Sequence, residues 1–129
     1  MAQKIIQPKD LSDPRPRYSQ GILVEGGKLL FIAGQTASDK DGGVVGKGDI
    51  EAQTHQVFKN LSAVLKEAGG SLENLVMTTT YITDREYREG YNRVRMQYYK
   101  TNPPTSTLVI VKGLAHPDYL IEINGVAVL

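Results

Sequence analysis

The chain has 129 residues, of which 40% are hydrophobic, so it can bury the core of one domain, which we expect to span residues 1–129. Its formal net charge is +1, which is too small to indicate nucleic acid or an anionic membrane as a partner. It contains no cysteine, which excludes disulfides, thiol chemistry and sulfur-ligated zinc.

The N-terminus has no long apolar run of the kind found in signal peptides. No segment approaches the roughly 20 apolar residues of a membrane span. The sequence therefore predicts a cytoplasmic protein with no membrane association. The two histidines, His55 and His116, lie far apart in the sequence and give no metal-ligand spacing, so we expect neither a metal nor another cofactor.

The N-terminal part of the chain predicts an arm followed by a hairpin. Residues 1–17 lack periodicity and carry three prolines, so we expect an arm or a short edge strand. Two β-rich runs follow, at residues 22–25 and 28–33, on either side of Gly26-Gly27. A turn of two glycines between such runs is typical of a β-hairpin. We therefore expect these two runs to pair with each other.

Two helices are expected in the middle of the chain. Apolar residues at helical spacing predict a helix over residues 50–68, capped by Asp49 and stopped by Gly69-Gly70. A second stripe, rich in tyrosine, predicts a helix at about residues 85–100.

The remaining β-rich segments complete the predicted fold. They lie at residues 75–83, 105–111 and 119–129, and each has the composition of a strand. The expected order is ββ(β)αβαββ. This order predicts an α+β domain with a mostly antiparallel sheet and both helices on one face.

Both faces of this sheet are expected to be apolar. In residues 28–33, Leu30 and Ile32 point to one side while Leu29 and Phe31 point to the other. Two helices are enough to cover only one face, and the chain has nothing left to cover the second. We therefore predict that another copy of the chain covers it, which makes the protein a homo-oligomer.

The last strand carries a carboxylate in the middle of an apolar run. Ile121 and Ile123 share one face of this strand, whereas Glu122 and Asn124 point to the other. If the isoleucines meet the helices, Glu122 lies on the face that needs a partner. A lone acid is costly to bury without partners. Either that face is exposed to solvent or Glu122 has a function.

Several segments, taken in order, resemble the RidA (YjgF) family over nearly the whole chain. They are residues 18–21 (YSQG), 31–35 (FIAGQ), 75–84, 91–92 (YN), 102–111 (NPPTSTLVIV) and 120–128 (LIEINGVAV). The resemblance implies a chorismate-mutase-like subunit and a homotrimer. It also implies a small-molecule cleft at each subunit interface.

The resemblance further implies a reaction, the hydrolysis of reactive enamines or imines to a carbonyl compound and ammonia. Glu122 matches the glutamate that positions the attacking water in such members, so it is the expected catalytic residue. The expected substrate-binding residues are Tyr18, Gly34, Gln35, Asn92, Ser106, Thr107 and Leu108.

Two positions depart from the family pattern. Ala33 stands where the family has a serine, and Ser106 stands where it has the arginine that binds the substrate carboxylate. An arginine offers a charged, bidentate fork, whereas a serine offers one neutral hydrogen bond. This leaves open a substrate other than the usual 2-imino acid. The sequence places no other arginine in the cleft, and Lys112 and His116 are the alternative cations considered.

Two other functions are weighed against deamination. Loss of the arginine favours a trimer that binds a metabolite without catalysis. Ribonuclease activity is the third hypothesis. The near-zero net charge and the lack of a basic stripe with interleaved aromatics argue against it.

Overall fold

A computed structural model describes residues 2–129 of the chain. The strands are β1 (Ala2–Ile6), β2 (Gly21–Glu25), β3 (Leu29–Gln35), β4 (Leu75–Ile82), β5 (Thr105–Ile110) and β6 (Ile121–Val128), and the helices are α1 (Ile50–Glu67) and α2 (Arg88–Tyr98). The predicted order of elements and the α+β class are confirmed. Within residues 2–129, neither helix is both long and apolar enough to cross a bilayer.

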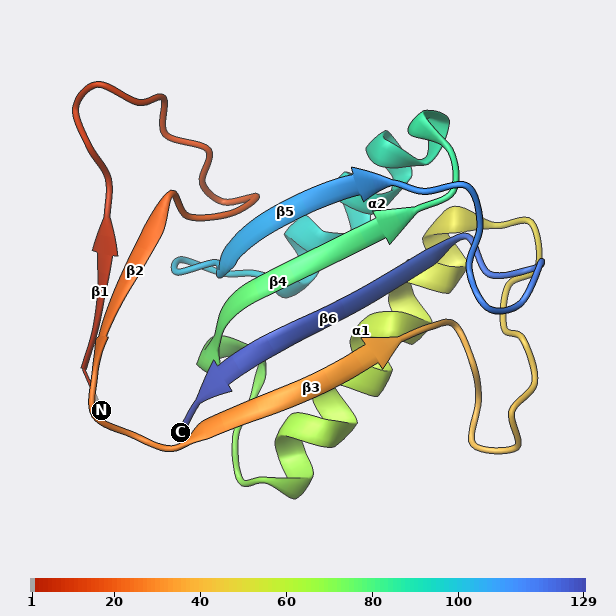
Figure 1. Ribbon diagram of the computed structural model, residues 1–129, viewed down its shortest axis with the longest axis horizontal. Helices are drawn as coiled ribbons and strands as arrows, with labels where there is room; N and C mark the ends of the chain where they lie inside the picture. The colour runs from red at the N-terminus through yellow and green to blue at the C-terminus, as the bar shows by residue number, and fades with distance from the viewer. Residues whose placement is uncertain (1) are drawn as a thin grey trace.

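The body of the molecule is a four-stranded sheet in the order β3-β6-β4-β5. The β3–β6 and β6–β4 pairs are antiparallel, and the β4–β5 pair at one edge is parallel. Both helices lie on the same face of this sheet (Figure 1). The sheet is therefore the single wall that separates a helix-covered side from an uncovered side.

The core forms between helix α1 and the helix-facing side of the sheet. The side chain of Asp49 accepts a hydrogen bond from the Ala52 amide at 3.0 Å and so caps the helix as expected. The apolar stripe of α1 is fully buried, and so are alternate residues of β6. These core residues are Val57, Phe58, Leu61 and Leu65 of α1, and Ile121, Ile123 and Ala127 of β6.

The predicted hairpin between β2 and β3 is wrong. Strand β2 pairs with β1 over a five-residue antiparallel register and forms a separate two-stranded sheet. Lys28 and Leu129 exchange two backbone hydrogen bonds, at 2.7 and 2.8 Å, and β3 runs on beside β6. Gly26-Gly27 therefore acts as a joint between two sheets, because each flanking strand finds a partner elsewhere in the chain.

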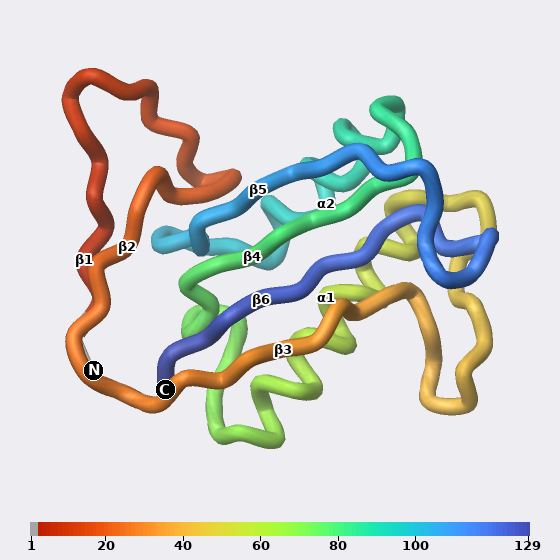
Figure 2. Tube along the Cα trace, in the orientation of Figure 1, coloured from red at the N-terminus to blue at the C-terminus, as the bar shows by residue number. Residues whose placement is uncertain are grey.

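Residues 7–20 connect β1 to β2 and pass near the beginning of β5 on the way (Figure 2). Ser19 fastens this segment, because its amide donates to the Pro104 carbonyl at 3.0 Å and its hydroxyl donates to the Pro103 carbonyl at 2.6 Å. Ser19 is buried. This attachment places the neighbouring Tyr18 beside helix α2.

The other face of the four-stranded sheet has no helix over it in the described part of the chain. Large apolar side chains stand exposed there, with Leu29 63%, Phe31 73% and Met77 52% accessible. An apolar surface of this kind usually marks an interaction site. The prediction that the second face is apolar and uncovered is confirmed for the chain.

We expect Leu61→Ala to lower the free energy of unfolding by about 2–5 kcal/mol, because it leaves a cavity under the sheet. Lys59→Ala, on the exposed side of the same helix, should change it by about 0.5 kcal/mol or less. Urea denaturation at one protein concentration measures both. Equal losses for the two variants would contradict the assigned core.

Candidate functional site

The strand register separates the expected site residues onto the two sides of the sheet. Glu122 pairs with Tyr81 and faces away from the helices. Ser106 pairs with Thr78, which pairs in turn with Gly125 on the helix-facing side. We call the two sets the outer-face group (Gly34, Thr107, Glu122) and the helix-side group (Tyr18, Asn92, Ser106, Leu108). Gln35 belongs to neither set, because it follows the register shift of β3 and pairs with the core residue Ile123.

The outer-face group is centred on the contact between Glu122 and Gly34. The register of β3 shifts between Ile32 and Gln35, and this shift brings Gly34 against the Glu122 side chain. A Cβ atom at position 34 would lie only 2.8 Å from the carboxyl carbon of Glu122. Only glycine leaves room for the carboxylate here.

Glu122 is half-buried on the sheet face that exposes the large apolar side chains. None of the ion pairs among residues 2–129 involves it. Thr107 points to the same face and is exposed, and the Gln35 amide donates to the Ala33 carbonyl at 3.1 Å. The group therefore presents one acid, without an ion-pair partner among residues 2–129, at the sheet face that no helix covers in the described part of the chain.

The helix-side group contains a cation that the sequence analysis did not place there. Nη1 of Arg95 donates to the Ser106 hydroxyl at 3.4 Å and to the Tyr91 hydroxyl at 2.9 Å. Its guanidinium carbon lies 4.5 Å from the ring centroid of Tyr91 and 5.9 Å from that of Tyr18. Arg95, on α2, therefore contacts Ser106, the position at which the family resemblance leads us to expect an arginine.

Neither alternative cation has this position. Lys112 is exposed, and so is His116, whose Nδ1 accepts from the Asp118 amide at 3.0 Å. The sequence did hold a signal for Arg95, because this charged residue falls on the buried stripe of a helix, three positions after Asn92.

Arg95 is buried without a counter-charge from residues 2–129. It is 5% exposed, and its Nε atom has no hydrogen-bond partner. Burial, and then the neighbouring Tyr91, raise the pKa of Tyr99 above that of an exposed tyrosine, although Arg95 opposes this shift. Tyr99 is therefore a neutral hydroxyl at physiological pH and supplies no negative charge.

Asn92 is the second member of this group with an unsatisfied atom. Its Oδ1 is buried and has no hydrogen-bond partner in the described part of the chain. Leu108, in contrast, packs against the hydrophobic core. The helix-side group therefore combines polar side chains that lack partners with an apolar floor.

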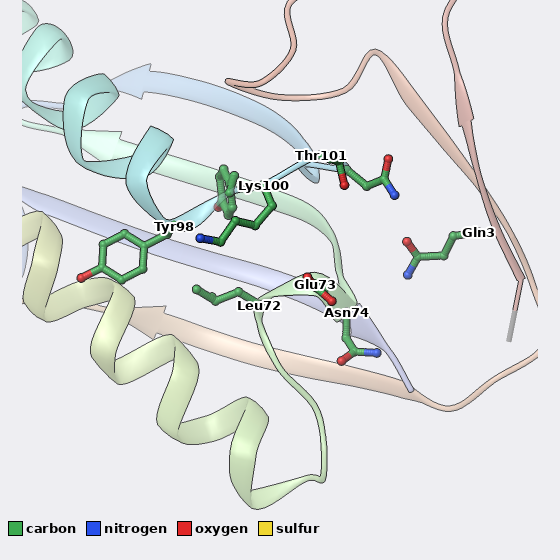
Figure 3. A pocket seen from close by; sticks show the side chains of 9 residues that line it. Gln3, Leu72, Glu73, Asn74, Tyr98, Lys100 and Thr101 are labelled. Carbon is green, nitrogen blue, oxygen red and sulfur yellow. The ribbon is translucent and has the colours of Figure 1, made fainter.

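One cavity lies away from both groups. It has a volume of about 340 Å³ and lies between β1 and the end of α2 (Figure 3). Its lining is mostly polar and includes Gln3, Glu73, Asn74, Lys100 and Thr101. None of the expected site residues lines it, so this cavity belongs to the junction between the arm and the body.

Comparisons with known proteins agree over the whole chain. The sequence model of the family described as Endoribonuclease L-PSP (Ribonuc_L-PSP) matches residues 9–129. A RutC family protein of Pyrococcus abyssi is 37% identical over 127 residues, which cover 98% of each chain. The crystal structure of the Rid family protein YyfB of Yersinia pestis has a TM-score of 0.93 at 32% identity, with 100% of both chains covered. RidA of an Antarctic Psychrobacter species has a TM-score of 0.74 at 27% identity, covering 98% of this chain and 99% of that one.

We expect Gly34→Ala to displace the Glu122 side chain, because the new methyl group occupies its place. The free energy of unfolding should change by about 1 kcal/mol or less, because a long side chain can adopt another rotamer. A crystal structure and a thermal melt test this. Gly113→Ala is the matched control, since nothing lies within 4 Å of its added Cβ. An unmoved Glu122 carboxylate would refute the packing described above.

Proposed function

Because the chain belongs to the endoribonuclease L-PSP family, in agreement with its resemblance to RidA (YjgF), we propose that it is a small-molecule deaminase. It hydrolyses a reactive enamine or imine to a carbonyl compound and ammonia. The observation that carries this proposal is Glu122, an acid without an ion-pair partner among residues 2–129, set beside Gly34 on an apolar face.

Glu122 acts as the general base and then as the general acid. Its carboxylate takes a proton from water as the water oxygen bonds to the C=N carbon of the imine, whose nitrogen accepts a proton from solvent. The carboxylic acid then returns its proton to the nitrogen of the tetrahedral adduct. The C–N bond breaks, ammonia leaves, and the hydroxyl of the adduct loses its proton as the carbonyl forms. Proton transfer of this kind contributes about 10²–10⁴-fold to a rate.

The proposed site is assembled between subunits of a homotrimer. The two groups lie on opposite sides of one sheet, so a single chain does not present both to one small molecule. A second copy that covers the outer face brings its own helix-side group toward Glu122. In this arrangement Tyr18, Asn92 and Ser106 of a neighbouring subunit orient the substrate.

Two other functions predict different results. A trimer that only binds a metabolite would be stabilised by its ligand but would show no turnover. Ribonuclease activity is suggested by the description of the family, but the chain has a net charge of only +1. Cleavage of RNA by the parent and by Glu122→Gln at the same rate would place that activity outside the proposed site.

We expect Glu122→Gln to reduce the rate of imine hydrolysis by about 10²–10⁴-fold, because the amide does not accept the proton of the attacking water. The enamine or imine is generated in the stopped-flow cuvette, and the decay of its absorbance measures the rate. Glu67→Gln, at an exposed position of α1, is the control and should match the parent protein. Full activity of Glu122→Gln would rule out the mechanism.

We expect Phe31→Lys to convert the trimer into single chains, because it places a charge in the apolar face that the other copies cover. Sedimentation velocity measures the mass. Leu23→Lys is the control, since Leu23 is 54% exposed but lies on β2, in the separate two-stranded sheet. A parent protein that sediments as one chain would refute the assembly.

A further inference from the structure

The buried charge of Arg95 has no counter-charge among residues 2–129. An ionised side chain placed away from water costs several kcal/mol unless it is paired. The rings of Tyr91 and Tyr18 provide cation–π attraction, which offsets only part of this cost. Neutral hydroxyls do not cancel the charge. The site therefore lacks one negative group.

In the described part of the chain, the hydrogen-bond donors of the guanidinium have partners at only one of its nitrogen atoms, Nη1. Both of its hydrogen bonds within residues 2–129 leave from Nη1, toward Tyr91 and Ser106. Nε is buried without a partner. Nε and Nη2 form one edge of the guanidinium, and this edge donates two parallel hydrogen bonds to a carboxylate. The unsatisfied edge thus has the donor geometry that a carboxylate accepts.

We propose that Arg95 binds the carboxylate of a small-molecule ligand, with the charge supplied from helix α2 instead of from β5. Ser106 and Tyr91 hold Nη1 and so fix the guanidinium plane, while the Nε–Nη2 edge receives the ligand. This proposal rests on the proposed function in one respect, because the helix-side group is half of that site. If Arg95 binds a carboxylate, the substrate can carry a carboxylate even though β5 has no arginine at position 106.

Tyr18 is the residue of the N-terminal segment that lies against the Arg95 guanidinium. It lies in the irregular segment 7–20, which Ser19 anchors through Pro103 and Pro104. The phenol is half-buried and lies against the guanidinium at 5.9 Å. Tyr18 therefore packs against the guanidinium from a loop segment, outside the hydrophobic core cluster.

The test is an equilibrium titration of the whole protein with pyruvate, in which isothermal titration calorimetry measures the affinity. Methyl pyruvate is the neutral counterpart, and inorganic phosphate is the competing oxyanion. We expect pyruvate to bind and methyl pyruvate to bind at least about 30-fold more weakly. Arg95→Met should weaken pyruvate binding by at least about 30-fold, as for the loss of one partner of a buried charge pair.

Two variants keep the result interpretable. Arg93→Met removes an exposed arginine of the same helix, which pairs with Glu51, and should bind pyruvate as the parent does. Arg95→Lys keeps the charge but lacks the fork, so it should fold and bind with intermediate affinity. Circular dichroism melts confirm that each variant is folded.

Several results would overturn the proposal. They are equal affinity for pyruvate and its ester, no binding of pyruvate by the parent, tighter binding of phosphate, and parental affinity in Arg95→Met. If the parent binds no pyruvate and Arg95→Met dissociates the oligomer, a carboxylate of a second copy fills the fork instead. Because pyruvate contains no C=N bond, a failure of the deaminase mechanism leaves this result readable.

Discussion

The structure depends on one sheet that is covered on a single side. Strand β6 lies inside this sheet, between β3 and β4, and its alternation divides the functional residues. Ile121 and Ile123 enter the core beneath α1, so Glu122 and Asn124 necessarily face the other way. The hydrophobic effect that fixes the isoleucines therefore also places an acid on an apolar surface. A monomer has no means of covering this surface with residues 2–129.

A second constraint is the charge beneath β5. Arg95 belongs to the buried stripe of α2, where an apolar residue would contribute more to stability. Tyr91 accepts from its Nη1 and bonds in turn to Thr80, so this polar network spans helix and sheet. The buried charge of Arg95 destabilises the fold, and one edge of its guanidinium has no partner among residues 2–129. This combination favours a role in ligand binding over a role in stability. The outer acid and the inner cation form a complementary pair that one chain holds apart.

Local patterns in the sequence were sufficient for the elements, the N-terminal cap of α1 and the division of faces, because burial periodicity and capping act within a few residues. They were insufficient where distant partners compete. The Gly26-Gly27 turn favoured a hairpin, but β1 offered β2 a full register elsewhere. Arg95 was visible in the helical stripe, yet only the packed structure showed that it contacts Ser106. Helical periodicity identifies which residues are buried but not which residues of other elements they contact.

The central claim is that one functional site joins the outer face of one subunit to the helix side of another. Hybrid oligomers made from Glu122→Gln chains and Arg95→Met chains test it most directly. Each variant alone should be inactive in imine hydrolysis. In an equal mixture about a quarter of the sites pair an intact Glu122 with an intact Arg95, so about a quarter of the parental activity should return. Hybrids that form, as native mass spectrometry would show, yet stay inactive would contradict the claim.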